Sequence, residues 1–592
     1  MRKIIYIILT VSLIVQSCSL DENYYVHIEK DSYIEDASTA RDVLFGLYRD
    51  LASLDLYGHR LSICYDLPTD ISKVDGNSLA NNRDFCNNAH SSTNAWVQNT
   101  WRAAYKTIYD ANSFIESVDK SWSRLSENDK KIIEVYVAEA RVIRALMYFE
   151  LVRNWKNIIL ITSVEESRQH PSTFEQDDPE DVYEFIEKEL KESAAVLPWA
   201  TSDNIRMDNS FMVSKGSAYA LLARVCVTWA GYPMHNELKW KEAKDACDSI
   251  ITSGKHGLLA DYEDLWKNSC NSKWDPTESL FEISFYSPSI SSASSNNCSG
   301  YIGKWNGVYV VTNTTSLVRV DARYRAIATF AAGWPEPRRD KRFSLSIADY
   351  YYEGTTKLGK QTIDDAGTVR WYEESSRDGI RKVYRVDGSN KIDFMTTIDN
   401  PYNLSAKFPY REGLYVAKWD LTKYVEPGKQ LADGNQSNAN WYLLRYSDVL
   451  LMYAEAINEI SGPNADAYAS VNMVRRRGYG CKSLLEDAPD IDLPSGLSQE
   501  QFRDAIRKER AYELCFEGNR KQDLIRWGIY AKSVVDVAPA MNVWCDGASS
   551  YILAAQYTDY VDGEESKHNL QPIPQRELDL MTEFEQNPKW GK

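Results

Sequence analysis

The spacing of apolar residues predicts a succession of helices between residues 37 and 253. Side chains three and four positions apart share one face of an α-helix, so apolar residues with this spacing form a stripe that packs against neighbouring helices. Asp178-Pro179 has the order of an N-cap followed by proline in the first turn, and Leu197-Pro198 ends that helix. The clearest stripe comprises Val135, Ala138, Val142, Leu146, Phe149 and Val152.

The pattern changes between residues 254 and 440. Short alternating runs at residues 280–285 and 308–311 are set among Gly, Ser, Asn and Pro. Alternation over a few residues is typical of half-buried strands, and the flanking residues are typical of turns. Loops held by a rigid scaffold often carry function, so we expect the functional site in this segment.

Helical spacing resumes at Trp441 and predicts helices over residues 443–459, 466–477, 502–516 and 520–532. Gly462-Pro463 and Gly518 mark breaks between partners. Antiparallel helix pairs about 34 residues apart suggest tetratricopeptide-like packing. We therefore predict a mainly α fold: a tetratricopeptide-like scaffold of helical pairs with a loop-rich insertion that contains short strands.

The first 18 residues predict export. Two positive charges follow Met1, residues 4–15 are uncharged and mostly apolar, and Val15-Gln16-Ser17-Cys18 comes next. This order is typical of a secretory signal peptide, and the run is short of the roughly 20 apolar residues that span a bilayer. A cysteine directly after the cut predicts a bacterial lipobox, with lipid attached to Cys18. The alternative is an ordinary signal peptide with a cysteine there by chance.

The predicted organisation follows from these segments. We assign residues 1–17 to the signal peptide, 18–36 to a lipidated tether and 37–592 to a single domain. Within the domain, the helical part 37–253 precedes the insertion 254–440, which is expected to bear the ligand face, and the helical part 441–592 follows it.

Charge and cysteine content narrow the class of protein. A formal net charge of -17 argues against nucleic acid or anionic lipid as a partner, because both require a basic face. Nine cysteines besides Cys18 are irregularly spaced, so a disulfide framework is not expected, although one bridge such as Cys270 to Cys298 is compatible with a site outside the cytoplasm.

Known catalytic and cofactor motifs are absent from the sequence. It contains no H-E-x-x-H, no G-x-S-x-G, no P-loop and no G-x-G-x-x-G. We predict no catalytic residues, no metal site and no cofactor. With 85 acidic residues, no carboxylate pair stands out as that of a glycosidase.

The aromatic content favours a ligand with flat faces. The chain has 17 Trp and 38 Tyr against 16 Phe, and rings with a polar group suit positions between core and solvent. Trp274 in Lys273-Trp274-Asp275-Pro276 and Trp334 in Gly333-Trp334-Pro335 lie in turns. Such rings either pack on the scaffold or face outward, where they could stack on sugar.

Five segments together resemble the SusD/RagB family. Any one of these segments alone is weak evidence, but five in order behind a lipobox make a specific match that covers nearly the whole mature chain. They are AEARVIRALMYFELVRNW (138–155), NWYLLRYSDVLLMYAEAINE (440–459), VNMVRRRGYG (471–480), IRKERAYELCFEGNRKQDLIRWG (506–528), and NLQPIPQREL (569–578) with Gln586-Asn587-Pro588. Two features depart from the family: Lys156-Asn157-Ile158-Ile159 replaces its usual Gly-Asp-Val-Pro, and residues 254–440 match no family pattern.

The resemblance implies a function and a place for the site. Family members are surface lipoproteins of Bacteroidetes that capture nutrients, mostly glycans, for a SusC-like TonB-dependent transporter. Acidic Asp21 and Glu22 resemble the family's surface-export signal. The implied binding face combines the loop after the first helix with the insertion. The candidate ligand-binding residues there are Asp70, Arg83, Trp96, Trp274, Tyr286, Trp305, Trp334 and Trp371.

Each candidate also has a structural interpretation. Asp70 and Arg83 are suited to bind sugar hydroxyls but are equally compatible with solvated loop charges, and Trp96 could simply begin a helix. Carboxylates set among arginines also have a catalytic interpretation, but we expect these residues to form ion pairs that hold helices together. These charges are Arg445, Asp448, Glu455, Glu509, Glu513, Glu517 and Arg520.

Three functions follow from these features. The first is a non-catalytic outer-membrane lipoprotein that binds an oligosaccharide and delivers it to a transporter. The second is a peptide- or protein-binding import lipoprotein of the same architecture. The third is a surface glycosidase or esterase whose carboxylates lie in the insertion.

Overall fold

The computed structural model describes residues 33–591, apart from 76–80, 201–211, 286–297, 312–319, 349, 354–355, 359, 364–368, 373–383, 387–391, 395–413, 427–435 and 546–549. Cys18 and Tyr286 lie outside the described residues. Trp371 lies in a described strand, but its side chain is outside the description.

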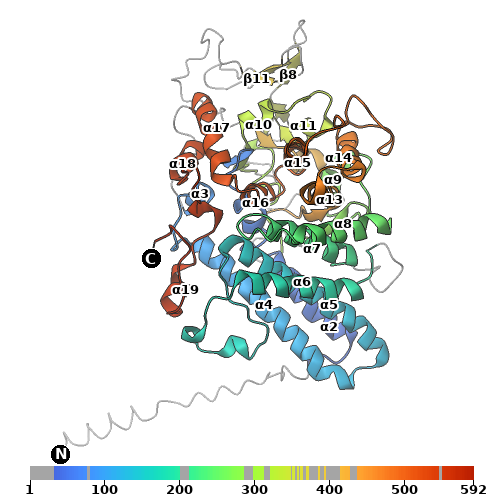
Figure 1. Cartoon of the computed structure of the whole chain (residues 1–592), viewed down its shortest axis with the longest axis vertical. Helices are drawn as coiled ribbons and strands as arrows, with labels where there is room; N and C mark the ends of the chain where they lie inside the picture. The colour runs from blue at the N-terminus through green and yellow to red at the C-terminus, as the bar shows by residue number, and fades with distance from the viewer. Residues whose placement is uncertain are drawn as a thin grey trace, which may run out of the picture.

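The N-terminal part consists of helices that pack in sequence order (Figure 1). Asp178 caps α6 by accepting a hydrogen bond from the Glu180 backbone, with Pro179 in the first turn, as the sequence predicts. The apolar stripe of α5 is buried because α4 and α6 pack on either side of it. The helices of this part are α2 (Ala37–Leu51), α3 (Asn81–Cys86), α4 (Ala95–Ser121), α5 (Glu127–Trp155), α6 (Pro179–Val196), α7 (Lys215–Ala230) and α8 (Lys239–Ser253), with the π-helical turn η2 (Arg60–Cys64). The insertion begins with a further helix, α9 (Tyr262–Cys270).

The insertion contains short strands, as the sequence predicts. Its largest sheet is antiparallel, in the order β1-β4-β12-β5, and joins Ser72 of the first loop to Ala326 of the insertion. The members of this sheet are β1 (Ser72–Val74), β4 (Tyr324–Ala326), β12 (Tyr415–Val416) and β5 (Ile347–Ala348). The other strands of the insertion are β2 (Ser279–Ile283), β3 (Val310–Val311), β6 (Tyr351–Glu353), β7 (Thr356–Leu358), β8 (Lys360–Ile363), β9 (Val369–Tyr372), β10 (Tyr384–Val386) and β11 (Ile392–Phe394), and its short helices are α10 (Ala328–Ala332), α11 (Lys341–Ser346) and α12 (Leu421–Tyr424).

The C-terminal part is helical and packs on the N-terminal helices, with α13 against α7 and α8. Its helices are α13 (Tyr446–Ser461), α14 (Ala465–Gly478), α15 (Gln499–Glu513), α16 (Arg520–Arg526), α17 (Tyr530–Cys545), α18 (Ser550–Tyr557) and α19 (Gln575–Leu580). The mainly α fold with helical pairs and short strands is therefore confirmed.

Two predicted helices differ most from the structure. The helical pattern from Trp441 begins with a strand, β13 (Trp441–Arg445), because β2 (Ser279–Ile283) supplies backbone partners along its edge. The predicted helix 520–532 is interrupted between α16 and α17, where Gly528 has a φ of 70°, a left-handed conformation that favours glycine.

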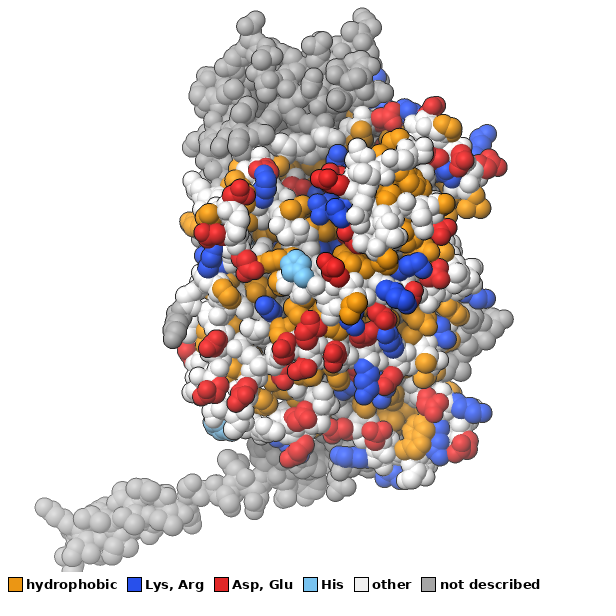
Figure 2. All heavy atoms as spheres, viewed as in Figure 1, with side chains coloured by type: hydrophobic (Ala, Val, Ile, Leu, Met, Phe, Trp, Pro, Cys, Tyr) orange, Lys and Arg blue, Asp and Glu red, His pale blue; other side chains and the backbone are white. Residues whose placement is uncertain are grey.

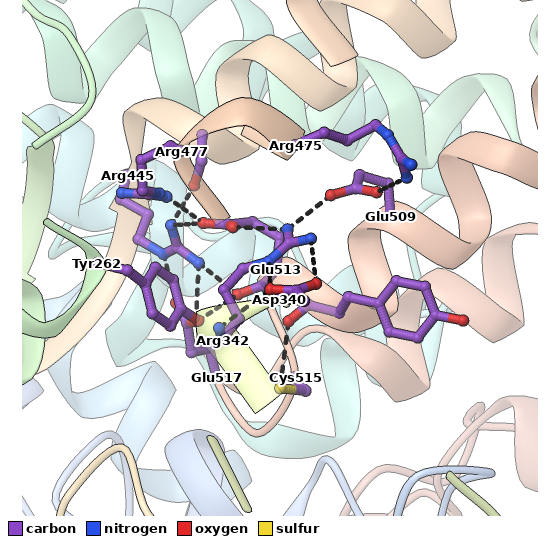
Figure 3. Close-up of polar contacts among 12 residues, drawn as sticks. Tyr262, Asp340, Arg342, Arg445, Arg475, Arg477, Glu509, Glu513, Cys515 and Glu517 are labelled. Atoms are coloured by element: carbon purple, nitrogen blue, oxygen red, sulfur yellow. Dashed lines mark hydrogen bonds and ion pairs between the residues drawn. The ribbon is translucent and has the colours of Figure 1, made fainter. Parts of the chain in front are cut away.

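A buried network of charges joins the insertion to α14 and α15 (Figure 3). Glu513 is fully buried and accepts bonds from Arg445 and Arg477 at 2.5 Å each and from Arg342 at 3.1 Å. Burial pushes the pKa of Glu513 up, but the charges of Arg477, Arg445 and Arg342 outweigh it and hold the pKa well below its usual value. Glu513 is therefore an ionised structural centre.

The other signature charges are paired in the same way. Asp448 of α13 binds Arg224 of α7 at 2.6 Å and Arg510 of α15 at 2.7 Å. Glu455 binds Arg526 of α16 at 2.6 Å. All of these side chains are 10% exposed or less, so the interpretation as inter-helix ion pairs is confirmed.

The last residues of the chain clamp the end of α5. The Trp155 indole nitrogen donates to the Pro572 carbonyl oxygen at 3.0 Å, and the Asn587 amide donates to the Trp155 and Gln571 carbonyl oxygens at 2.9 and 2.8 Å. The main hydrophobic core runs from Ile34 to Phe584 and draws on all three parts of the chain.

The surface is strongly charged. Figure 2 shows Asp and Glu side chains spread among Lys and Arg, particularly over the helices in the lower half of this face. This distribution agrees with the formal net charge of -17. None of the described helices combines the length and the apolar composition needed to cross a membrane.

Candidate ligand-binding site

Four rings from three separate segments form one cluster. His59 is the central member: its ring centroid lies 5.2 Å from that of Trp96, 4.5 Å from Tyr301 and 4.4 Å from Trp305. Trp96 and Trp305 lie 6.1 Å apart. We call His59, Trp96, Tyr301 and Trp305 the aromatic cluster. It brings together two residues of the predicted binding face, Trp96 and Trp305, from the first helical part and the insertion.

Local backbone structure fixes where these rings lie. The Asn94 side chain caps α4 by accepting a hydrogen bond from the Trp96 backbone nitrogen at 2.9 Å, which holds Trp96 in the first helical turn. On the insertion, the Tyr301 backbone nitrogen donates to the Gly58 carbonyl oxygen at 2.7 Å. This bond attaches the insertion to the residue next to His59.

A tight turn then presents Trp305. The Trp305 backbone nitrogen donates to the Tyr301 carbonyl oxygen at 3.0 Å. A Cβ atom on Gly307 would lie 2.1 Å from the Gly303 carbonyl oxygen, so only glycine fits at residue 307. The turn therefore depends on its glycines to bring Trp305 against His59.

The cluster has a buried side and an accessible side. His59 and Trp305 are 5% and 6% exposed, whereas Trp96 and Tyr301 are half-buried. Burial, with the nearby charges of Arg60 and Arg323, lowers the pKa of His59 to about 3. His59 is therefore a neutral ring at physiological pH, and its Nε2 lies 3.3 Å from the Cys64 sulfur.

Cations border the rings. The Arg60 guanidinium lies 5.4 Å from the Trp96 ring centroid, and the Arg323 guanidinium lies 5.7 Å from that of Trp305. Arg323 also has 27% of its side chain exposed. A flat ring beside a guanidinium offers both a stacking face and hydrogen-bond donors, which suits a polyhydroxylated ligand with one apolar face.

Arg83 is connected to this border through Asp75. Its Nε donates to the Asp75 carbonyl oxygen at 2.7 Å, and a terminal nitrogen donates to the Asp75 carboxylate at 3.1 Å. The Asp75 backbone nitrogen donates to the Arg323 carbonyl oxygen at 2.7 Å. The structure thus links the predicted residue Arg83 to Trp305 through Asp75 and Arg323.

Asp70 has a different partner. Its carboxylate accepts two bonds from Arg520 of α16, at 2.8 and 2.6 Å. Both oxygens bind one guanidinium in a bidentate ion pair, a strong and specific arrangement. Asp70 therefore holds the first loop against the C-terminal helices, and we do not place it on the binding face.

Trp334 is a core residue. Its side chain has no exposed surface, its indole nitrogen donates to Asp340 at 3.1 Å, and its ring lies 4.8 Å from that of Tyr512. The turn at Gly333 folds this ring inward against α15, so it offers no face to a ligand. Trp274 is half-buried in the turn between α9 and β2.

Sequence reasoning missed His59, Tyr301, Arg60 and Arg323. Tyr301 could have been found, because it lies four residues before Trp305 on the other side of Gly303. No local pattern distinguishes His59, whose role depends on contacts with residues more than 35 positions away. Within the described residues, no group of three or more His, Cys, Asp or Glu side chains is arranged to hold a metal ion.

Comparison with known proteins gives consistent matches. A family described as "SusD family" matches residues 277–590, and one described as "Starch-binding associating with outer membrane" matches residues 48–227. SusD-like protein P25 of Formosa agariphila is 26% identical over 549 residues, which cover 90% of this chain and 91% of the relative.

Solved structures extend these matches to the fold. A SusD homolog from Bacteroides thetaiotaomicron is 43% identical with a TM-score of 0.84, and the match covers 95% of this chain and 99% of the other. Surface glycan-binding protein A from the same species, solved in complex with laminarihexaose, is 19% identical with a TM-score of 0.62 and coverage of 93% and 99%. The latter likeness concerns the fold alone.

Proposed function

The chain belongs to the SusD family, and from this premise we propose that it binds an oligosaccharide without cleaving it. The observation that carries the proposal is the aromatic cluster, in which Trp96 and Tyr301 keep accessible faces while His59 and Trp305 support them. The relative bound to laminarihexaose and the starch-binding family description favour the same class of ligand.

The geometry suggests how a glycan would be held. A sugar ring has a flat face of C–H groups, which stacks on an indole or phenol ring, and a rim of hydroxyls, which needs hydrogen-bond partners. Trp96 and Tyr301 would supply stacking surfaces, and Arg83 and Arg323 would supply donors at the rim. Because the rings are already packed on His59, little ordering would accompany binding.

The second part of the proposal concerns the cellular location of the protein and its partner. We place the protein on the outer membrane, anchored through lipid on Cys18, where it passes captured glycan to a SusC-like TonB-dependent transporter. The description of the family that matches residues 48–227 supports membrane association. The signal-like start of the chain supports export.

Binding of a glycan panel to the full chain, measured by calorimetry, tests the proposal. We expect Trp96→Ala and Tyr301→Ala each to weaken binding about tenfold or more, since loss of about 1.4 kcal/mol changes an affinity tenfold. Trp122→Ala is the matched control, because Trp122 lies at the opposite end of α4, about 39 Å away at 1.5 Å per residue.

Two outcomes would contradict it. Release of smaller sugars during long incubation with the bound glycan would show catalysis and support the glycosidase hypothesis. Failure to bind any glycan, with capture of members of a peptide pool, would favour the peptide-import alternative.

A further inference from the structure

The Arg323 side chain lies beside the aromatic cluster with its hydrogen-bonding capacity largely unused. Its guanidinium lies 5.7 Å from the Trp305 ring centroid, and 27% of the side chain is exposed. Its ion-pair partner is Asp321, at a long N–O distance of 3.5 Å, and within the described residues the guanidinium donates no hydrogen bond. A guanidinium carries five N–H donors. Arg323 therefore offers a positive charge and available donors beside the rings.

Backbone hydrogen bonds hold Arg323 next to the cluster. Its carbonyl oxygen accepts a bond from the Asp75 backbone nitrogen at 2.7 Å. The next residue, Tyr324, begins β4 and donates its backbone nitrogen to the Trp305 carbonyl oxygen at 2.8 Å. These bonds attach the start of β4 to the first loop on one side and to the turn of Trp305 on the other, so the guanidinium stays within reach of the rings.

A second arginine acts on the same rings. The Arg60 guanidinium lies 5.4 Å from the Trp96 ring centroid, and Arg60 forms an ion pair with Asp55. After burial, the charges of Arg60 and Arg323 are the causes that lower the pKa of His59. Both positive charges are therefore felt at the centre of the aromatic cluster, where the neutral His59 ring cannot offset them.

The neighbouring sheet adds positive charge. Strands β1 and β4 pair with Lys73 directly opposite Arg325, a position in which like charges repel. Asp75 lies two residues after Lys73, and its carboxylate serves two arginines, Arg83 at 3.1 Å and Arg325 at 4.0 Å. The formal net charge of the chain is -17, yet cations gather around these rings. The candidate ligand-binding site is therefore suited to a negatively charged group.

On the basis of the proposed function, we propose that the oligosaccharide is acidic and that Arg323 pairs with a carboxylate or sulfate group on it. A sugar stacked on Trp96 or Tyr301 has its substituents at the rim, near the guanidiniums that border the rings. Both kinds of anion present at least two oxygens to the fork of an arginine, and such charge-assisted bonds are stronger than those to a neutral hydroxyl. The rings bind the sugar face, and Arg323 selects for charge.

Calorimetry on the full chain with matched oligosaccharides tests the inference. The probes are laminarihexaose, which is neutral, an oligogalacturonide with its methyl-esterified form, and a sulfated carrageenan oligosaccharide with its desulfated form. We expect an acidic probe to bind about tenfold or more tightly than its neutralised counterpart, because bonds to a charged partner contribute more than neutral ones. Preference for the oligogalacturonide identifies a carboxylate as the group bound, and preference for the carrageenan identifies a sulfate.

Variants of Arg323 assign the preference to this side chain. Arg323→Gln should weaken binding of the acidic probe about tenfold and leave that of its neutralised form nearly unchanged, because a hydrogen-bond donor remains but the charge is lost. Arg323→Lys keeps the charge without the fork and should lie between the two. Arg168→Gln is the matched control: it changes the net charge equally, at a side chain that is 68% exposed. Melting temperatures verify that each variant is folded.

The outcomes separate this inference from the proposed function. Equal affinity for the acidic and neutralised probes, or binding of laminarihexaose alone, would overturn the acidic ligand and leave oligosaccharide binding intact. An acidic preference that survives in folded Arg323→Gln would overturn the role of Arg323. Failure of every probe to bind would count against both the proposed function and the inference that rests on it.

Discussion

At the residue scale, His59 supports the candidate ligand-binding site through its contacts with the other three rings of the aromatic cluster. It contacts the three other rings of the aromatic cluster and is buried and neutral. Its contribution is therefore shape and packing rather than charge. Trp96 and Tyr301 depend on it for their positions.

We predict that His59→Ala weakens glycan binding about tenfold and lowers the free energy of unfolding by about 2–4 kcal/mol, because a cavity opens between Trp96 and Trp305. His59→Phe keeps a flat ring and should retain most of the affinity. Calorimetry and denaturant unfolding measure the two effects. Equal losses for the two variants would contradict a packing role, and exposed His170→Ala provides the control.

Glu282 is a second residue whose surroundings set its behaviour. It lies buried on β2 and accepts hydrogen bonds from Ser279 at 2.8 Å and Asn440 at 2.7 Å. Burial raises its pKa to about 7 from an ordinary value of 4.5, helped by the charge of Asp275 and opposed by the two hydrogen bonds. The folded protein therefore holds this proton more tightly than the unfolded chain.

The sign of the pH effect follows directly. The stability that Glu282 contributes is full below about pH 4.5 and is lost as the pH rises through about 7, up to about 3 kcal/mol. We predict that Glu282→Gln removes this part of the loss of unfolding free energy between about pH 5 and pH 8. Urea titrations across that range measure it, with exposed Glu486→Gln as control. An unchanged pH slope in Glu282→Gln would show that Glu282 does not titrate in this range.

At the element scale, buried ion pairs hold the insertion against the C-terminal helices α14 and α15. Arg477 of α14 binds Glu278 beside β2 at 2.8 Å and Glu513 of α15 at 2.5 Å. These contacts fix the base of the insertion to two C-terminal helices. The orientation of the insertion, and with it Tyr301 and Trp305, depends on this attachment.

We predict that Arg477→Met lowers the free energy of unfolding by about 3–5 kcal/mol, because two buried carboxylates lose a partner. Arg503→Met should cost less than about 1 kcal/mol, since its pair with Glu459 is partly exposed. Denaturant unfolding of both variants gives the comparison. Similar losses for both would mean that burial of the network does not set its contribution.

The elements also show what sequence can and cannot supply. The 3.6-residue spacing of apolar positions suffices to predict α5 and α6, although α6 buries one stripe against its neighbours whereas α5 is buried on nearly all sides from Ala138 to Trp155. The same spacing misassigns β13, since Trp441 to Arg445 become a strand only through pairing with β2, more than 150 residues earlier. Local pattern does not contain that partner.

The candidate site is likewise predicted from the sequence only in part. Composition and family resemblance lead to Trp96 and Trp305, which do meet. Turn chemistry misleads at Trp334, because Gly333-Trp334-Pro335 predicts a bend but not its direction, and the bend points into the core. Asp70 was a candidate for sugar binding, but its partner Arg520 lies 450 positions along the chain.

At the scale of the whole molecule, the proposed lipid anchor and the candidate ligand-binding site lie in separate parts of the chain. Cys18 lies outside the described residues, whereas the aromatic cluster lies between residues 59 and 305 of the folded domain. We predict that Cys18→Ala abolishes attachment to the outer membrane and leaves the melting temperature and glycan affinity unchanged. Cell fractionation and surface labelling measure attachment, with Ser19→Ala as control. Retained surface display of Cys18→Ala would contradict lipidation.

The clamp on α5 has a consequence for the order in which the protein is made. Trp155 donates to a carbonyl oxygen 417 residues further along the chain. At 5–20 residues per second, synthesis of that stretch takes about 20–80 s, during which the end of α5 has no clamp. Trp155 therefore lacks these hydrogen-bond partners until residues 572–587 have been made. Loss of the 572–587 segment would leave the end of α5 without the hydrogen bonds that Pro572 and Asn587 make with Trp155.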